Sequence, residues 1–315
     1  MGNARHARKR LPQFTDRLVL GTQGLRVSPY CLGLVHSAET VAAAFEAGIN
    51  FFFITTDMHW PVYEATRRGV RELLARGPAI RDQIVVAAVC YQTWPIFCHV
   101  PFQELLHEMP GLERLDVLIA GGVYGGEQGK RFAVYEGHRE AGFLGARAIG
   151  MTFHDRSAAR AAIRDRRVDI AFIRYNPYHP GAATDLFPHL HSSSPGNGRS
   201  RGKGVARTLL FNFKSTSGYV PPPAMEAMGL RPSVYWHPKI TDHYRFVLSR
   251  PEIDGVLLAL KTPEELQGLA EALDRGPLTE EEQAYLRDVA LVARGEAKVE
   301  PEENVQEVNH ANDAK

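Results

Sequence analysis

The sequence alternates short apolar segments with amphipathic ones, and this alternation constrains the fold more than any other feature. Segments typical of helices, such as residues 38–47 before the helix-stopping Gly48 and residues 62–75, separate the apolar ones. The apolar segments are residues 30–35, 49–55, 83–90, 115–120, 146–151, 168–174, 205–211 and 256–260. Parallel strands buried on both faces have such continuous apolar runs, and helices supply their right-handed crossovers. The pattern predicts an α/β protein with a closed (β/α)8 barrel; an open doubly wound sheet is the alternative.

Composition bounds the class of protein. The chain has 315 residues, of which 44% are hydrophobic and 23% charged, with a formal net charge of +1. Such a chain buries a large core, and its charge gives it no general attraction to nucleic acid or to an acidic membrane. No apolar stretch approaches the ~20 residues of a membrane-spanning helix. Cys31, Cys90 and Cys98 include no close-spaced pair that would predict a disulfide framework. We therefore expect a soluble cytoplasmic protein with no nucleic-acid or membrane partner.

Three segments depart from the alternating pattern. Residues 1–14 predict a disordered basic tail, because no apolar run of a signal peptide follows their charges. Residues 192–204 (SSSPGNGRSRGKG) predict a flexible insertion before the seventh strand. Residues 296–315 are polar and mostly acidic, which predicts a disordered tail. The barrel is therefore expected over residues 15–295, with a capping box at Thr279 and Glu282 opening its last helix.

Several motifs recur in order along most of the chain. They are residues 17–28 (RLVLGTQGLRVS), 31–34 (CLGL), 47–52 (AGINFF), 81–87 (RDQIVVA), 147–150 (RAIG), 168–169 (VD) with 175–176 (YN), and 263–266 (PEEL). In order and spacing, over residues 17–287, they resemble the aldo-keto reductases. The resemblance implies a (β/α)8 TIM barrel whose N-terminal β-hairpin plugs the bottom of the barrel. It also implies an active site at the carboxyl ends of the strands, where that family performs NADPH-dependent hydride transfer.

The resemblance fails at the residues that carry the family's chemistry. Its hydride transfer uses an Asp, a Tyr, a Lys and a His, whose positions fall on Phe53, near Met58, on Val89 and on Gly121. None of these side chains can exchange a proton with a carbonyl oxygen. A small shift of the alignment does not restore the set, since residues 84–119 contain no Lys and residues 115–134 contain no His. We therefore expect a degenerate catalytic tetrad.

The cofactor side departs from the family as well. The positions that bind nicotinamide and adenine fall on residues without the required polar groups, namely Thr152, Phe153, Phe172, Gly268 and Leu269. Lys261 and Thr262 are left as candidate phosphate partners, and Phe211 as an aromatic that could stack on a ring. This pattern weighs against NADPH and leaves the cofactor unknown.

Polar side chains nevertheless follow several of the predicted strands. His36 follows the first strand, Asp57 and His59 follow the second, and His154 follows the fifth. Two His and one carboxylate facing an open cavity are a ligand set for non-haem iron or, with water, for zinc. In Asp57-x-His59 both side chains lie on one side of an extended segment, so His36 or His154 could complete the set. These four residues are the candidate metal ligands, although a lone loop His more often hydrogen-bonds or is solvated.

The same groups support a metal-free alternative. His59 or His154 would act as general acid or base, with Asp57 orienting one of them. Lys214, after the seventh strand, could form a Schiff base with a carbonyl substrate, the alternative being a solvated lysine. The residues expected to contact substrate are Trp60, Tyr91, Arg174, Asn176 and Tyr178.

Three functions follow as hypotheses. The first is an enzyme that acts on a small organic substrate and has been repurposed away from NADPH hydride transfer. The second is an NADPH-dependent aldo-keto reductase with an alignment different from ours. The third is a non-catalytic binding or scaffold barrel, which predicts a mouth closed by Phe53, Met58 and Phe153. No heptad or edge-strand signal sets the oligomeric state.

Overall fold

The closed barrel predicted by the alternating pattern is confirmed. A computed structural model describes residues 10–190 and 207–298. In chain order its barrel strands are β3 (Tyr30–Leu34), β4 (Phe51–Ile54), β5 (Val85–Cys90), β6 (Val117–Val123), β7 (Ala148–Phe153), β8 (Ile170–Arg174), β9 (Leu209–Phe213) and β10 (Gly255–Ala259). They pair in parallel in this order, and β10 closes the ring by pairing with both β9 and β3. The open doubly wound sheet is therefore excluded.

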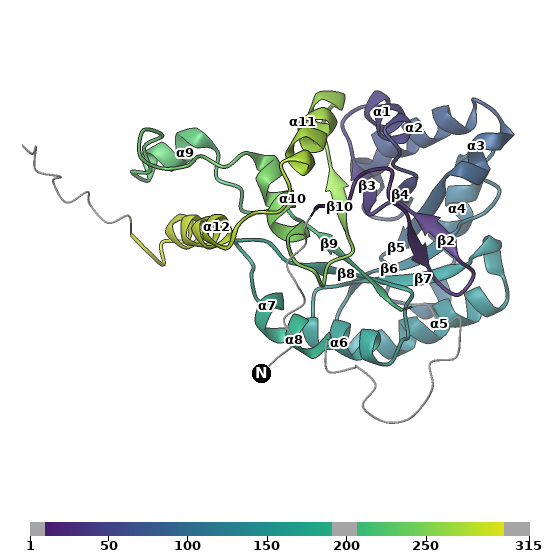
Figure 1. The fold of residues 1–315 in the computed structure, drawn as a ribbon. Coiled ribbons are helices and arrows are strands. Elements are labelled where there is room, and N and C mark those ends of the chain that lie inside the picture. The colour runs from purple at the N-terminus through teal and green to yellow at the C-terminus, as the bar shows by residue number, and fades with distance from the viewer. Residues whose placement is uncertain (1–9, 191–206, 299–315) are drawn as a thin grey trace, which may run out of the picture.

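The described chain has twelve helices, most of which surround the barrel (Figure 1). They are α1 (Ala38–Glu46), α2 (Glu64–Leu74), α3 (Pro78–Gln83), α4 (Val100–Glu108), α5 (Gln128–Glu140), α6 (Arg156–Arg164), α7 (Ala182–Asp185), α8 (Phe187–Leu190), α9 (Pro222–Ala227), α10 (Ile240–Leu248), α11 (Pro263–Asp274) and α12 (Glu280–Ala293). Short 3-10 turns lie at η1 (Trp60–Tyr63), η2 (Pro95–Phe97), η3 (Gly125–Glu127) and η4 (Phe143–Gly145). None of the helices in the described ranges is long and apolar enough to cross a membrane.

Each barrel strand separates two apolar cores. In β4, Phe51 and Phe53 belong to the cluster inside the barrel, whereas Phe52 and Ile54 belong to the cluster beneath the helices. This alternation follows from the two-residue period of a strand. Inside the barrel, Phe172 packs against Phe53 with ring centroids 5.4 Å apart and against Phe211 at 5.6 Å. Aromatic side chains therefore fill the barrel below its mouth.

The N-terminal hairpin closes the bottom of the barrel, as predicted. Strands β1 (Leu18–Leu20) and β2 (Leu25–Val27) pair in an antiparallel ladder. Leu20, Leu25 and Val27 are buried in the same cluster as the inward-facing strand residues. The hairpin therefore closes the barrel interior at this end, and the interior can open to solvent only at the opposite end, where the strands finish.

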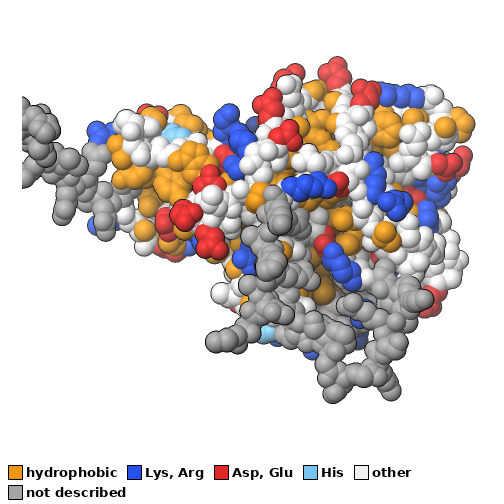
Figure 2. All heavy atoms as spheres, viewed as in Figure 1, with side chains coloured by type: hydrophobic (Ala, Val, Ile, Leu, Met, Phe, Trp, Pro, Cys, Tyr) orange, Lys and Arg blue, Asp and Glu red, His pale blue; other side chains and the backbone are white. Residues whose placement is uncertain are grey.

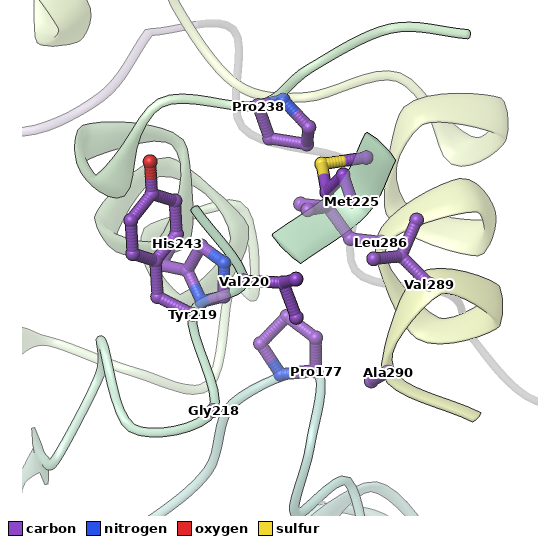
Figure 3. A pocket seen from close by; sticks show the side chains of 10 residues that line it. All are labelled: Pro177, Gly218, Tyr219, Val220, Met225, Pro238, His243, Leu286, Val289 and Ala290. Carbon is purple, nitrogen blue, oxygen red and sulfur yellow. The ribbon is translucent and has the colours of Figure 1, made fainter. Parts of the chain in front are cut away.

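Helices α9 and α12 lie to one side of the barrel (Figure 1). Met225 of α9 and Val289 of α12 are buried against each other in a small cluster with Leu230. Figure 3 shows where this cluster meets the barrel, at His243 of α10 and at Pro177. On the face drawn in Figure 2, acidic and basic side chains are interspersed, in keeping with the net charge of +1.

Some predicted boundaries are wrong. Residues 10–14, which were predicted as part of a disordered tail, pack against the barrel, because Leu11 and Phe14 are buried and the Tyr30 hydroxyl donates to the Pro12 carbonyl at 2.6 Å. Strand β9 runs over Leu209–Phe213 rather than residues 205–211, because its register pairs Leu209 with Ile170. Gln83 ends α3 instead of opening a strand. The insertion at 192–204 and nearly all of the predicted tail at 296–315 lie outside the described residues.

Candidate functional site

A cavity of about 510 Å³ opens at the carboxyl ends of the barrel strands. This is the end of a (β/α)8 barrel where active sites are built, and the volume is in the range of small-molecule sites. The residues lining it are Leu34, Phe53, His59, Val62, Tyr63, Tyr91, Thr152, His154, Phe213, Lys214, Thr216, Ser217, Leu257, Leu258 and Ala259. The mouth is therefore not closed by Phe53, Met58 and Phe153: Met58 is 77% exposed and Phe153 packs in the outer core.

Asp57 and His59 form a pair on the loop that follows β4. The His59 Nδ1 atom lies 3.9 Å from the Asp57 Oδ1 atom, and the Asp57 side chain is only 3% exposed, against 45% for His59. The Asp57 carboxylate also accepts hydrogen bonds from the backbone amides of Tyr91 and His59. Two backbone amides thus fix the carboxylate close to the Nδ1 edge of an imidazole that reaches the cavity, although 3.9 Å is longer than a hydrogen bond.

Two phenols lie beside this pair. The Tyr91 ring packs against His59 at a tilt of 42° with centroids 4.0 Å apart, and the Tyr63 and Tyr91 hydroxyls are close enough for each to affect the pKa of the other. Burial raises the pKa of Tyr91 to about 12 and raises the pKa of Tyr63 well above its usual value. Both hydroxyls therefore keep their protons at neutral pH and act as hydrogen-bond donors.

Tyr63 is the site residue that the sequence did not reveal. It lies in η1, further along the loop than the position near Met58 on which the family's Tyr falls. In the sequence, Tyr63 is an aromatic phenol located between the end of β4 and the start of α2. A residue at that distance from a strand end can reach back to the cavity, and this position is the feature that could have predicted it. The pKa of Tyr63 is raised, whereas a neighbouring ammonium group would lower the pKa of a phenol. Tyr63 is therefore not activated in the way that the family's catalytic Tyr is.

His154 and Lys214 line the cavity across the mouth from the Asp57–His59 pair. His154 stacks against Tyr124 at 5.4 Å and meets the edge of Phe213 at 5.5 Å. Burial, followed by the charges of Lys214 and Arg174, holds the pKa of His154 below its ordinary value. At neutral pH His154 is therefore a neutral imidazole beside a lysine ammonium group.

Most of the predicted substrate contacts do not reach the cavity. Of the five residues, only Tyr91 lines it. Asn176 is fully buried and holds the backbone of Lys214, donating to its carbonyl at 2.7 Å. Tyr178 packs under the Arg294 guanidinium at 5.3 Å, and Trp60 packs against Arg67 at 5.5 Å. Arg174 lies near His154 but outside the lining.

The predicted metal set is not assembled. Within residues 10–190 and 207–298 there is no group of three or more His, Cys, Asp or Glu side chains placed to hold a metal ion. Only Asp57 and His59 come together, and the Asp57 carboxylate is already engaged by two amides. His154 stands across the mouth, and His36 is not among the lining residues. Asp57 and His59 are close together because they are two residues apart in the sequence, whereas the barrel holds His36 and His154 away from them.

The predicted cofactor contacts are not suited to a dinucleotide. Phe211 is fully buried inside the barrel, with its ring 5.9 Å from that of Phe51, so it cannot stack on a ligand at the mouth. Thr262 caps α11 through the Glu265 amide, and the Glu265 carboxylate accepts from the Lys261 amide at 2.7 Å. A phosphate at this helix N-terminus would meet carboxylates instead of free amides.

Comparisons with known proteins place the fold and no more. No family model matches the sequence, and neither does any curated protein. Among solved structures, the chain is similar to the aldo-keto reductase AKR11C1 from Bacillus halodurans in its holo form. The TM-score is 0.65 at 15% sequence identity, with 91% of this chain and 98% of that one covered. The protein therefore has the (β/α)8 barrel of the aldo-keto reductase fold, and its chemistry must be argued from its own site.

Proposed function

We propose that this protein is an enzyme that transfers protons on a small carbonyl compound, with His59 as the acid or base and Asp57 as its positioning residue. The observation that carries the proposal is the Asp57–His59 pair at the cavity edge, with a buried carboxylate held by backbone amides. A carboxylate that orients an imidazole is the arrangement that makes histidine an effective general base. The aldo-keto reductase fold, which belongs to a family of enzymes, is compatible with this reading.

The neighbouring phenols give the substrate a defined place. The Tyr91 hydroxyl, which keeps its proton at neutral pH and lines the cavity, donates a hydrogen bond to a substrate oxygen. The His59 Nε2 atom, remote from Asp57, then takes a proton from the carbon next to that carbonyl group. The electron pair of the broken C–H bond moves toward the oxygen that Tyr91 holds. Returning the proton to a different carbon gives an isomerase, and losing a leaving group gives a lyase.

Deuterium exchange tests this chemistry without knowledge of the natural substrate. The protein is incubated in D2O with phenylpyruvate, phenylacetaldehyde and cyclohexanone, and incorporation is followed by mass spectrometry. We expect exchange above the rate of heat-denatured protein, and a loss of about 100-fold in His59→Gln, because a general base contributes on that order. Asp57→Asn is expected to lose less, since it misorients the base without removing it.

The matched control is His107→Gln, an exposed histidine on α4. It should exchange at the wild-type rate. Wild-type exchange no faster than that of denatured protein, or full activity in His59→Gln, contradicts the proposal.

A further inference from the structure

Resting on the proposed function, the geometry points to the substrate class: an organic anion with an apolar, aromatic-sized body, whose carboxylate or phosphate binds at Lys214. The assignment concerns the side of the cavity across from His59, which the acid–base proposal does not use. It follows from the distribution of charge in the cavity, from the backbone that presents Lys214, and from the apolar wall facing it.

The charge around the cavity is one-sided. The lining includes the cation Lys214, and none of the described lining residues is an Asp or Glu. The Asp57 carboxylate, next to the lining residue His59, is buried and already accepts from two backbone amides. Neither Lys214 nor Arg174 forms an ion pair with any Asp or Glu in the described parts of the chain. A cation that lines a cavity without a protein partner is free to pair with an anionic ligand.

A second cation strengthens the field on this side of the mouth. Lys214 and Arg174 both lower the pKa of His154, and both act on His179 in the same direction. Their charges therefore reach the same region, although Arg174 is not in the lining itself. Lys214 is the contact that we assign to the anion, and Arg174 contributes to the potential around it.

The backbone conformation at Lys214 is unfavourable for a lysine and is held in place by buried side chains. Lys214 has φ of 57°, in the left-handed region that non-glycine residues avoid. The fully buried Asn176 fixes the turn by donating to the Lys214 carbonyl at 2.7 Å. Asn212, also fully buried, donates to the Ser215 hydroxyl at 2.8 Å and accepts from the Tyr175 amide. Buried amides thus hold a strained residue at the cavity, a combination that clusters at binding sites.

The rest of the cavity is apolar enough to hold the body of the ligand. Phe53, Phe213 and Leu257 line it together with the Tyr63 and Tyr91 rings. A flat apolar group lying on these side chains, with its anionic end at Lys214, would extend toward His59 on the opposite side. The cavity volume of about 510 Å³ accommodates a ligand of two fused or linked rings.

Isothermal titration calorimetry with three probes of one shape tests the assignment. The probes are 4-phenylbenzoate, its neutral amide 4-phenylbenzamide, and 4-biphenylyl phosphate, so the carboxylate and phosphate arms are compared directly. We expect at least one anion to bind roughly ten-fold more tightly than the amide. Lys214→Gln should reduce anion affinity to that of the amide and leave amide affinity unchanged. Arg174→Gln should cause a smaller loss, and Lys130→Gln, an exposed lysine on α5, should cause none.

The outcomes separate this inference from the proposed function. His59→Gln should still bind the anions more tightly than the amide, even where its deuterium exchange is lost. Equal affinity for acid and amide, no binding of any probe, or wild-type anion affinity in Lys214→Gln each overturns the anion site. None of those three results bears on whether His59 catalyses exchange. Conversely, a protein without exchange activity that still binds the anions through Lys214 retains this site and loses the catalytic proposal.

Discussion

Lys214 adopts a backbone conformation that its side chain makes costly. The residue follows β9 directly with φ of 57°, and the buried Asn176 side-chain amide donates to its carbonyl. The left-handed region costs an L-residue about 1–2 kcal/mol, because Cβ crowds the following carbonyl. Backbone strain that lowers the stability of the fold is expected at a cavity mouth where a side chain has been selected for ligand binding.

Replacing this lysine by glycine separates the cost of the backbone strain from any stabilisation that the lysine side chain provides. Lys214→Gly is expected to raise the free energy of unfolding by up to about 1 kcal/mol, because relief of strain outweighs the extra chain entropy of glycine. Urea unfolding at neutral pH measures the change, with Lys214→Gln as the control that keeps the strain. A loss of stability in the glycine variant would show that the lysine stem packs against the cavity wall.

The chemistry-bearing residues could be predicted to different extents. Asp57, His59, His154 and Lys214 immediately follow strands, so their place at the mouth could be inferred from the chain alone. Asn176 also follows a strand, yet it is buried and supports the backbone of the site. A position just after a strand predicts at which end of the barrel a residue lies. Whether its side chain enters the cavity depends on the conformation of the loop.

At the scale of elements, the closure of the barrel depends on a glycine. Gly255 opens β10, which pairs with both β9 and β3. A Cβ at this position would lie 2.2 Å from the Pro29 carbonyl oxygen and 2.5 Å from the Phe211 ring. The first neighbour is the backbone carbonyl just before β3, which accepts from the Val256 amide at 2.9 Å and cannot move without breaking that bond.

Two alanine substitutions should therefore have opposite signs. Gly255→Ala is expected to destabilise the protein by about 1–3 kcal/mol, the usual cost of overpacking. Gly268→Ala, within α11 where a Cβ meets nothing within 4 Å, should stabilise it by up to about 1 kcal/mol through helix propensity. Thermal and urea unfolding of both variants provide the comparison. Equal effects at the two positions are incompatible with a steric role for Gly255.

The last helix is an element whose start the sequence predicted correctly. The Thr279 hydroxyl accepts from the Glu282 amide at 3.1 Å, and the Glu282 carboxylate accepts from the Thr279 amide at 2.8 Å. Local residues complete this capping box, so no tertiary contact is needed to recognise it.

Thr279→Ala removes one half of the capping box. We expect a loss of about 1 kcal/mol in the free energy of unfolding, since an orphan amide is left at the helix start. Thr279→Ser keeps the hydroxyl and should recover most of the loss. Urea unfolding of the three proteins at neutral pH is the measurement, and an alanine variant as stable as wild type would exclude this cap as a contributor.

At the scale of the whole molecule, a buried histidine couples stability to pH. His243 lies where α10 meets the α9 and α12 cluster, 4% exposed, and its Nδ1 atom has no hydrogen-bond partner in the described structure (Figure 3). Burial lowers the pKa of His243 to about 4, against the opposing effect of Asp242. The unfolded chain therefore binds a proton at this residue more readily than the folded protein does.

This difference fixes the sign of one pH effect. The contribution of neutral His243 is fully present above its unfolded pKa of 6.5 and is lost as the pH falls toward about 4. The whole loss is on the order of 3 kcal/mol. His243→Phe cannot titrate, so the fall of its unfolding free energy between neutral pH and about pH 4 should be smaller than in the wild type by this amount. An identical pH dependence in the two proteins would falsify the assignment, and His107→Gln is the control.

The sequence by itself determined the barrel, the plugged bottom implied by its family resemblance, and several of the residues at its mouth. These follow from local information, because apolar runs, helix stops and hairpin motifs are properties of neighbouring residues. Only the tertiary structure decided which of those residues share the cavity: it brought Tyr63 in, buried Phe211 and Asn176, and kept His36 and His154 from completing a metal set with Asp57 and His59. The reason is that a closed ring places strand ends at fixed positions around a circle, whereas the inward or outward direction of each side chain depends on register and loop path.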